Sequence, residues 1–147
     1  MSTSRIPAVV TALFSAFDAA TDATVFDGRW VTTPDGDYLT VGWTPDDEGS
    51  SGSQEWVGLG NRARTERIDI PCYIDSYSGD VDTASRRNAA FTILAACENA
   101  LRADPTLGGA VPQPGWAEFG EYRERIEQTE TGLAVGVVFH VLIETRI

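Results

Sequence analysis

The chain of 147 residues carries a formal net charge of -11 and is 42% hydrophobic, which favours one folded domain, residues 1–147, over a disordered chain. All of its positive charges are arginines, and so acidic a surface disfavours nucleic-acid binding, which draws on clustered cations. No apolar run approaches the roughly 20 residues that span a bilayer, and the N-terminus lacks the features of a signal peptide. We therefore expect no membrane partner and synthesis in a cytoplasm.

Residues 4–20 are predicted to form the first helix. Apolar residues recur there at helical spacing, Ser4 can cap the first turn, and Pro7 is tolerated near a helix start. The sequence VFDG and an apolar run from Tyr38 to Trp43 come next. The turn residues PDGD that precede Tyr38 predict a hairpin in this region.

Residues 44–61 are predicted to be a mobile loop between two strands, because acidic, serine and glycine residues replace the apolar pattern. The carboxylates Asp46, Asp47 and Glu48 could hold a cation. They lack, however, the alternating ligands and the closing glutamate of a calcium loop. A solvated loop is the favoured interpretation, and no metal site is predicted.

The stretch RTERIDIPCYID, residues 64–75, alternates strictly between two faces. The isoleucines and Cys72 share one face, which predicts a strand with one buried side. Pro71 cannot donate a ladder hydrogen bond, so the strand is expected at a sheet edge or bulged at this residue. Ion pairing with carboxylates is favoured over phosphate binding for the basic cluster at its start. That cluster comprises Arg62, Arg64 and Arg67.

Residues 82–103 are predicted to form a long helix that lies on the sheet, capped by Asp82 or Thr83 and carrying one apolar stripe. The two cysteines, one on this helix and one on the strand, are expected as reduced thiols in one core. Their number and spacing fit neither a disulfide framework nor a zinc site. The glycine pair Gly108 and Gly109 is predicted to turn the chain and not to bind phosphate, since phosphates bind at helix N-termini.

Two strands are predicted to close the chain, a charged one over residues 116–129 and a long one that begins at Gly132 and has one apolar face. The charged strand is either a contact between subunits or an edge strand that its charges protect from aggregation. The predicted core residues are Ile70, Cys72, Phe91, Leu94, Cys97, Leu101, Val137 and Phe139.

Signals of catalysis are few. The single histidine, His140, alternates outward on the last strand with no serine or cysteine beside it in a nucleophile pattern. A structural or interface histidine is therefore favoured over a general base. The four tryptophans are scattered over four segments, which favours packing over a sugar-binding platform. We expect neither enzymatic activity nor a cofactor.

The order of these elements resembles a known family. An N-terminal amphipathic helix, VFDG, a strand ending LTVGW, the alternating RIDIPCYI, the helix RRNAAFTILAACENALRADPTLGGAV and a closing strand ending ETRI are similar to the tail-terminator (tail-completion) proteins of long-tailed bacteriophages. The resemblance runs from Arg5 to Ile147. It implies an α+β fold with a mixed, mainly antiparallel β-sheet and two main helices packed on one face.

The resemblance also implies a structural protein of the virion tail or neck, assembled in the bacterial host cytoplasm. Its subunits would form a ring, usually a hexamer, on the tail tube protein, stop tube polymerisation and offer a surface to the head connector or stopper protein. DNA would pass through without sequence-specific binding.

Two alternatives remain, namely another neck or head-tail connector protein and a small ligand-binding module. Exposure, flexibility and charge in the sequence select a candidate subunit or tube interface. Its residues are Asp46, Asp47, Glu48, Gln54, Trp56, Arg62, Arg64, Glu121, Arg123, Glu124 and Arg125.

Overall fold

The computed structural model describes residues 3–32, 34, 36–46, 49–58, 63–79 and 82–147. Within these residues the chain forms two helices and a six-stranded sheet. In chain order the elements are α1 (Ile6–Ala20), β1 (Thr24–Asp27), β2 (Tyr38–Val41), β3 (Ser51–Trp56), β4 (Arg64–Ser78), α2 (Thr83–Ala103), β5 (Trp116–Thr129) and β6 (Gly132–Arg146).

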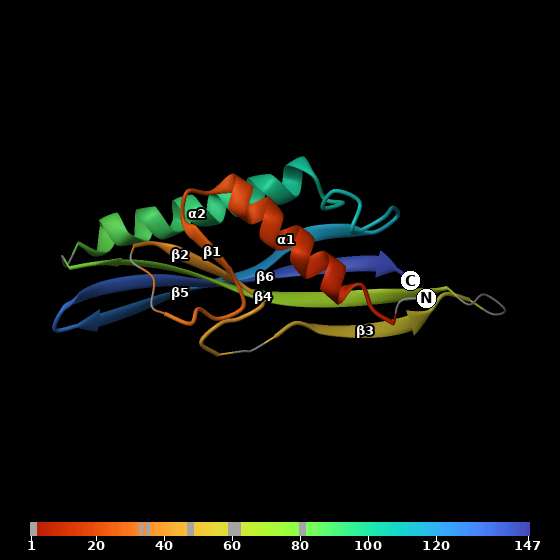
Figure 1. Ribbon diagram of the computed structural model, residues 1–147, viewed down its shortest axis with the longest axis horizontal. Coiled ribbons are helices and arrows are strands. Elements are labelled where there is room, and N and C mark those ends of the chain that lie inside the picture. The colour runs from red at the N-terminus through yellow and green to blue at the C-terminus, as the bar shows by residue number, and fades with distance from the viewer. Residues whose placement is uncertain (1–2, 33, 35, 47–48, 59–62, 80–81) are drawn as a thin grey trace.

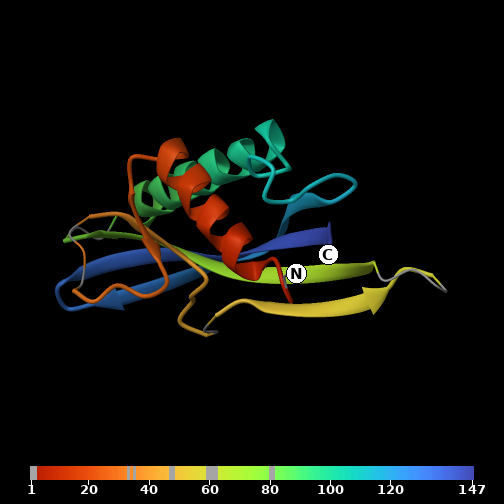
Figure 2. The ribbon, with the colours of Figure 1, turned by 45° about the vertical axis from the view of Figure 1, so that its right-hand side comes forward.

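Both helices lie on one face of the sheet, and two views of the ribbon agree on this arrangement (Figures 1 and 2). The strand order is β1-β2-β4-β6-β5, with β3 pairing with β4 off this path. The pair β1 and β2 is parallel and the other pairs are antiparallel. The structure therefore confirms the predicted α+β fold with a mixed, mainly antiparallel sheet and helices on one face.

Helix α1 begins two residues later than the sequence predicts. The Ser4 hydroxyl accepts a hydrogen bond from the Ile6 backbone N–H at 3.1 Å, as the sequence suggested. The carboxylate of Glu66, on β4, accepts the backbone N–H of Arg5 at 2.7 Å. A carboxylate at this position favours the helix, because the N-terminal end carries unpaired N–H groups and a partial positive charge.

Helix α2 packs against the central strands β4 and β6 and the edge strand β5. Its first turn is capped by Asp82, whose carboxylate accepts the backbone N–H of Ser85 at 3.2 Å. After the helix, Asp104 accepts the backbone N–H of Gly108 at 2.8 Å. Gly108 and Gly109 have positive φ angles of 67° and 94°, so this pair turns the chain as predicted.

The core lies between the helices and the sheet. Strands β4 and β6 pair over most of their length, and alternate residues of both point toward the helices, as the period-2 pattern predicts. Phe139 is fully buried, and its ring lies 6.1 Å from Phe17 and 5.3 Å from Phe119 between centroids. The buried residues of the helices and strands that form this core include Val9, Leu13, Ile70, Cys72, Ile74, Leu94, Cys97, Leu101, Val137 and Val141.

The hairpin predicted around PDGD is wrong, because β1 and β2 run parallel, with Thr24 opposite Tyr38. The connection between them does not reverse in a tight turn. Trp30, in this connection, packs on Tyr38 with ring centroids 4.7 Å apart. The chain therefore passes along the sheet face opposite the helices before it re-enters the sheet in the same direction.

The loop predicted over residues 44–61 needs a similar correction, because Ser51–Trp56 forms strand β3 against β4. All six residues of β3 are exposed. A strand with no buried face needs no apolar alternation, so its serines and glycine gave no strand signal. The strand β3 is defined instead by its backbone pairing with β4.

Pro71 also differs from expectation, since β4 is a central strand. The Pro71 carbonyl accepts the backbone N–H of Gly42 at 2.8 Å, so its nitrogen faces the side of β2 and β3. On that side Cys72 pairs with the last residue of β2, and Asp69 pairs with the first residue of β3. The proline thus lies at the gap between two partner strands, where no ladder donor is required.

Candidate functional site

The sheet face opposite the helices, called here the open face, has two parts. One part is covered by the chain between β1 and β3, where aromatic side chains gather. Trp30 and Trp43 meet edge to face with ring centroids 5.3 Å apart, and the Arg29 guanidinium lies 5.7 Å and 5.5 Å from their ring centres. Tyr38, Tyr73 and Val138 of the sheet are buried beneath them. These two tryptophans therefore serve packing.

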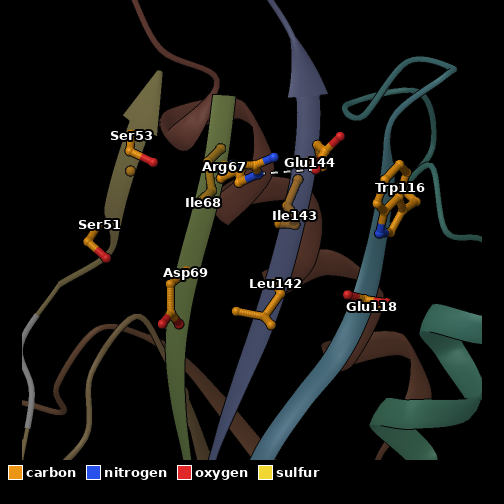
Figure 3. Close-up of a pocket in the computed structure, with 11 residues that line it drawn as sticks. Ser51, Ser53, Arg67, Ile68, Asp69, Trp116, Glu118, Leu142, Ile143 and Glu144 are labelled. Atoms are coloured by element: carbon orange, nitrogen blue, oxygen red, sulfur yellow. Dashed lines mark hydrogen bonds and ion pairs between the residues drawn. The ribbon is translucent and has the colours of Figure 1, made fainter. Parts of the chain in front are cut away.

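The other part of the open face is an exposed groove of about 440 Å³ (Figure 3). It is crossed by two rows of side chains, each row taking one residue from each of β3, β4, β6 and β5. The strand registers give the rows as Ser51, Asp69, Leu142 and Glu118, and as Ser53, Arg67, Glu144 and Trp116.

The groove combines exposed apolar and charged groups. Trp116 and Leu142 are 41% and 38% exposed. Arg67 is shared by two carboxylates, with its Nη1 3.4 Å from Glu55 and its Nε 3.3 Å from Glu144, and the second contact is drawn in Figure 3. Such solvent-exposed pairs contribute little to folding stability, about 0–1 kcal/mol each. Their charges remain available to a partner.

His140 lies on the same face, with its Nδ1 2.7 Å from the Asp69 carboxylate. An ionised carboxylate only accepts hydrogen bonds, so the proton of this contact belongs to Nδ1. Beside His140, a smaller hollow of about 240 Å³ is lined by Asp46 and by residues of β5 and β6 that include Arg123. Asp69 thus positions the His140 ring on the open face of the sheet.

Strand β5 is one edge of the sheet. On its open face the carboxylate of Asp46 is shared by two arginines, since it contacts the guanidinium of Arg123 and lies 3.5 Å from Nη1 of Arg125. On the helix side of β5, Glu124 accepts a hydrogen bond from Arg87 of α2 at 2.7 Å. Arg123, Glu124 and Arg125 of β5 therefore have charged partners within the chain.

Strand β3 lies at the opposite edge. Its Trp56 is 65% exposed, and the Arg64 guanidinium lies 5.6 Å from its ring centre. Gln54 donates a hydrogen bond from its side-chain amide to the carbonyl of Thr3, so this strand also holds the chain just before α1. Its backbone edge away from β4 has no strand partner among the described residues.

The structure divides the predicted interface residues into groups. Asp46, Arg123 and Arg125 come together on the open face, and Gln54, Trp56 and Arg64 come together at the β3 edge. Glu121 lies where the register between β5 and β6 shifts, and Glu124 pairs with α2. Asp47, Glu48 and Arg62 lie outside the described residues.

Sequence reasoning named Arg67 as a residue that pairs with carboxylates, as it does, but placed none of the groove residues of β4, β6 and β5 in an interface. On β4 and β6 they are outward positions of strands whose inward positions were recognised, whereas residues 116–129 were recognised only as a charged strand. Only the register between strands shows that they form two rows. The predicted core residues are buried, except Phe91, which is partly buried against the core.

Buried titratable groups lie away from the groove. Burial raises the pKa of Asp75, although hydrogen bonds from Tyr38 and Tyr73 oppose the shift. Burial also raises the pKa of Cys97 to about 12 and that of Cys72 above its usual range. Both cysteines are free thiols.

Two further findings concern the described part of the chain. No group of three or more histidine, cysteine, aspartate or glutamate side chains there is arranged to hold a metal ion. None of its helices has the length and apolar character needed to cross a membrane.

Comparison with known proteins gives a match in fold alone. No protein-family model matches the sequence, and no curated protein matches it. Among the solved structures, a chain of the virion of a native gene transfer agent (GTA) particle matches with a TM-score of 0.51 and 13% sequence identity. The match covers 97% of this chain and 99% of that chain, so the two share a fold over nearly their whole length.

Proposed function

We propose that this protein is a structural virion assembly protein that forms a ring on the end of a phage tail tube. The ring stops tube polymerisation and provides the surface to which the head attaches. The observation that carries the proposal is the likeness in fold, over nearly the whole of both chains, to a chain of a GTA virion. The order of sequence elements that resembles tail terminators supports the same assignment.

The shape of the sheet suits a closed ring. A ring needs two different surfaces on each subunit, so that each copy contacts the next head to tail. The edges formed by β5 and by β3 lie on opposite sides of the sheet and carry different side chains. A subunit of this kind can bind one neighbour at each edge.

The proposal names the partners as further copies of the chain, most simply six, the tail tube protein and the head connector or stopper protein. The net charge of -11 suits a lumen through which DNA slides without sequence-specific binding, since like charges repel. The site of action is the tail or neck of the virion, after assembly in the bacterial host cytoplasm. No catalysis and no cofactor are part of the proposal.

Deletion of the gene tests this function. We expect tails of uncontrolled length or tails without heads, seen by electron microscopy of the lysate. Normal infectious particles from the deletion strain would rule the proposal out. If the protein instead remains on tailless heads and is absent from headless tails, it is another neck or connector protein of the particle.

One observation favours a second candidate, a small ligand-binding module. The groove on the open face exposes Trp116 and Leu142 among charged side chains, and binding sites combine apolar walls with a few polar groups. This alternative predicts a stable monomer with a saturable rise in melting temperature on adding ligand. Light scattering across a concentration series distinguishes it from a ring.

A further inference from the structure

We propose that the edge strand β5 of one copy pairs with the edge strand β3 of the next copy, so that the sheet continues across the subunit contact. This inference rests on the proposed ring and names the surfaces that close it. Both strands are sheet edges, and an unpaired strand edge presents N–H and C=O groups that a second strand can satisfy. The occupant of each edge in this proposal is a second copy of this chain.

The strand directions permit this pairing. Strand β5 runs antiparallel to β6, β6 runs antiparallel to β4, and β3 runs antiparallel to β4. Within one copy, β3 therefore runs opposite to β5. If the next copy continues the sheet with its helices on the same side, its β3 meets β5 in antiparallel orientation.

The exposed aromatic residues of the two edges lie on matching faces. Tyr122 of β5 is on the helix side, where its ring meets Phe91 of α2. Trp56 is on the helix side of β3, because it pairs with Arg64, in phase with the buried Glu66 and Ile68 of β4. Trp56 and Tyr122 are 65% and 57% exposed. In a joined sheet they can form a cross-strand aromatic pair, which stabilises antiparallel strands.

The charges on the open face are complementary. At the β3 edge, one arginine, Arg67, is shared by the two carboxylates of Glu55 and Glu144. At the β5 edge the arrangement is reversed, because one carboxylate, Asp46, is shared by two arginines. The exposed carboxylate of Glu55 can therefore bind the exposed guanidinium of Arg123 from the neighbouring copy.

A single strand register allows both the aromatic pair and the ion pair to form. If Glu55 lies opposite Arg123 in an antiparallel pair, the adjacent residue Trp56 lies opposite Tyr122. Ser53 then lies opposite Arg125, and all of these pairs keep the side of the sheet on which their residues already lie. The proposal thus fixes the register as well as the partner.

Disulfide cross-linking of the full-length chain tests this register. A Glu55→Cys variant and an Arg123→Cys variant are mixed, allowed to assemble and oxidised with diamide. We expect a covalent dimer from the mixture and about tenfold less from either variant alone. The native cysteines do not interfere, since both are fully buried. A Glu98→Cys variant, altered at a partly exposed position on α2, is the control for random collision.

The outcomes separate this inference from the ring itself. Rings seen by light scattering and negative-stain imaging, without a cross-link between positions 55 and 123, would overturn the β3–β5 contact and leave the proposed function standing. Cross-linking of Arg123→Cys with itself would also overturn it, in favour of paired β5 strands. If the wild-type chain forms no ring alone or on purified tail tubes, the proposed function fails and the inference fails with it.

Charge reversal provides a second, independent variant set. Either Glu55→Arg or Arg123→Glu is expected to raise the protein concentration needed for half-assembly about tenfold, because like charges then face each other. Combining both reversals in one chain restores assembly. Glu98→Arg, a matched reversal on α2, leaves assembly unchanged. Failure of the double reversal to restore assembly, with each single variant still folded, would contradict the proposed ion pair.

Discussion

The carboxylate of Asp46 contacts the guanidinium of Arg123, although 77 residues separate the two in the chain. The sequence offered both residues as parts of a candidate subunit or tube interface, on separate segments. The structure shows that they already form an ion pair within one copy. On the open face, the charged strand β5 therefore contacts the segment between β2 and β3 through this ion pair.

The Asp46→Asn substitution is predicted to lower the free energy of unfolding by less than about 1 kcal/mol, because exposed ion pairs are screened by solvent. The Asp46 side chain is 48% exposed. Urea unfolding followed by tryptophan fluorescence measures the effect. Glu98→Gln, which breaks the exposed Glu98–Arg102 pair on α2, is the matched control. A loss above about 2 kcal/mol would mean that Asp46 does more than form a screened ion pair.

The Phe139→Ala substitution is predicted to lower the free energy of unfolding by about 3–5 kcal/mol, the usual cost of removing a buried aromatic ring. Phe139 is fully buried and contacts the rings of Phe17 and Phe119, so its loss opens a cavity between the helices and the sheet. Leu142→Ala, on the open face of the same strand, is expected to cost only about 0.5 kcal/mol. Equal losses for the two variants would contradict the assigned core.

The Asp75→Asn substitution is predicted to stabilise the protein more at pH 7 than at low pH. The folded state raises the pKa of Asp75 above the ordinary 3.8 by burial. It therefore binds the proton more tightly than the unfolded chain, and stability falls as the pH rises from 3.8 through the raised pKa. Asparagine carries no such cost. Urea midpoints of both proteins between pH 3 and pH 7 measure the difference.

The Asp82→Asn substitution is the control, because its effect on stability is expected to change with pH in the opposite direction. Hydrogen bonds from Ser85 lower the pKa of Asp82, so its contribution is present above the ordinary aspartate pKa and is lost as the pH falls through the lowered value. This variant should be less stable than the wild-type protein at pH 7, with the deficit shrinking in acid. The same pH trend for both variants would contradict one of the two assigned pKa shifts.

The two cysteines are predicted to resist thiol reagents in the native state. Both are fully buried, and burial raises the pKa of Cys97 to about 12 and raises that of Cys72 as well. The reactive thiolate is therefore scarce at neutral pH. Titration with Ellman's reagent at pH 8 should find no reactive thiol in the folded protein and two in urea. Rapid native labelling would contradict the burial.

Much of the fold follows from local patterns. The apolar spacing of α1 and α2 and the alternation along β4 and β6 predicted these elements to within a few residues, because each has a face that must be buried. Strand β3 was missed because both of its faces are exposed and its composition resembles a loop. The parallel pairing of β1 and β2 was missed because turn residues occur in long connections as well as in hairpins.

The sequence by itself determined the positions of both helices and which faces of β4 and β6 are buried, because these depend on residues close together in the chain. The fold class was implied by the resemblance in the order of these elements. Only the tertiary structure decided which strands are edges, that Asp46 reaches Arg123 and Arg125, and that four strands place their outward residues in two rows. Sheet order and register come from pairing between distant segments. Local periodicity carries no information about that pairing.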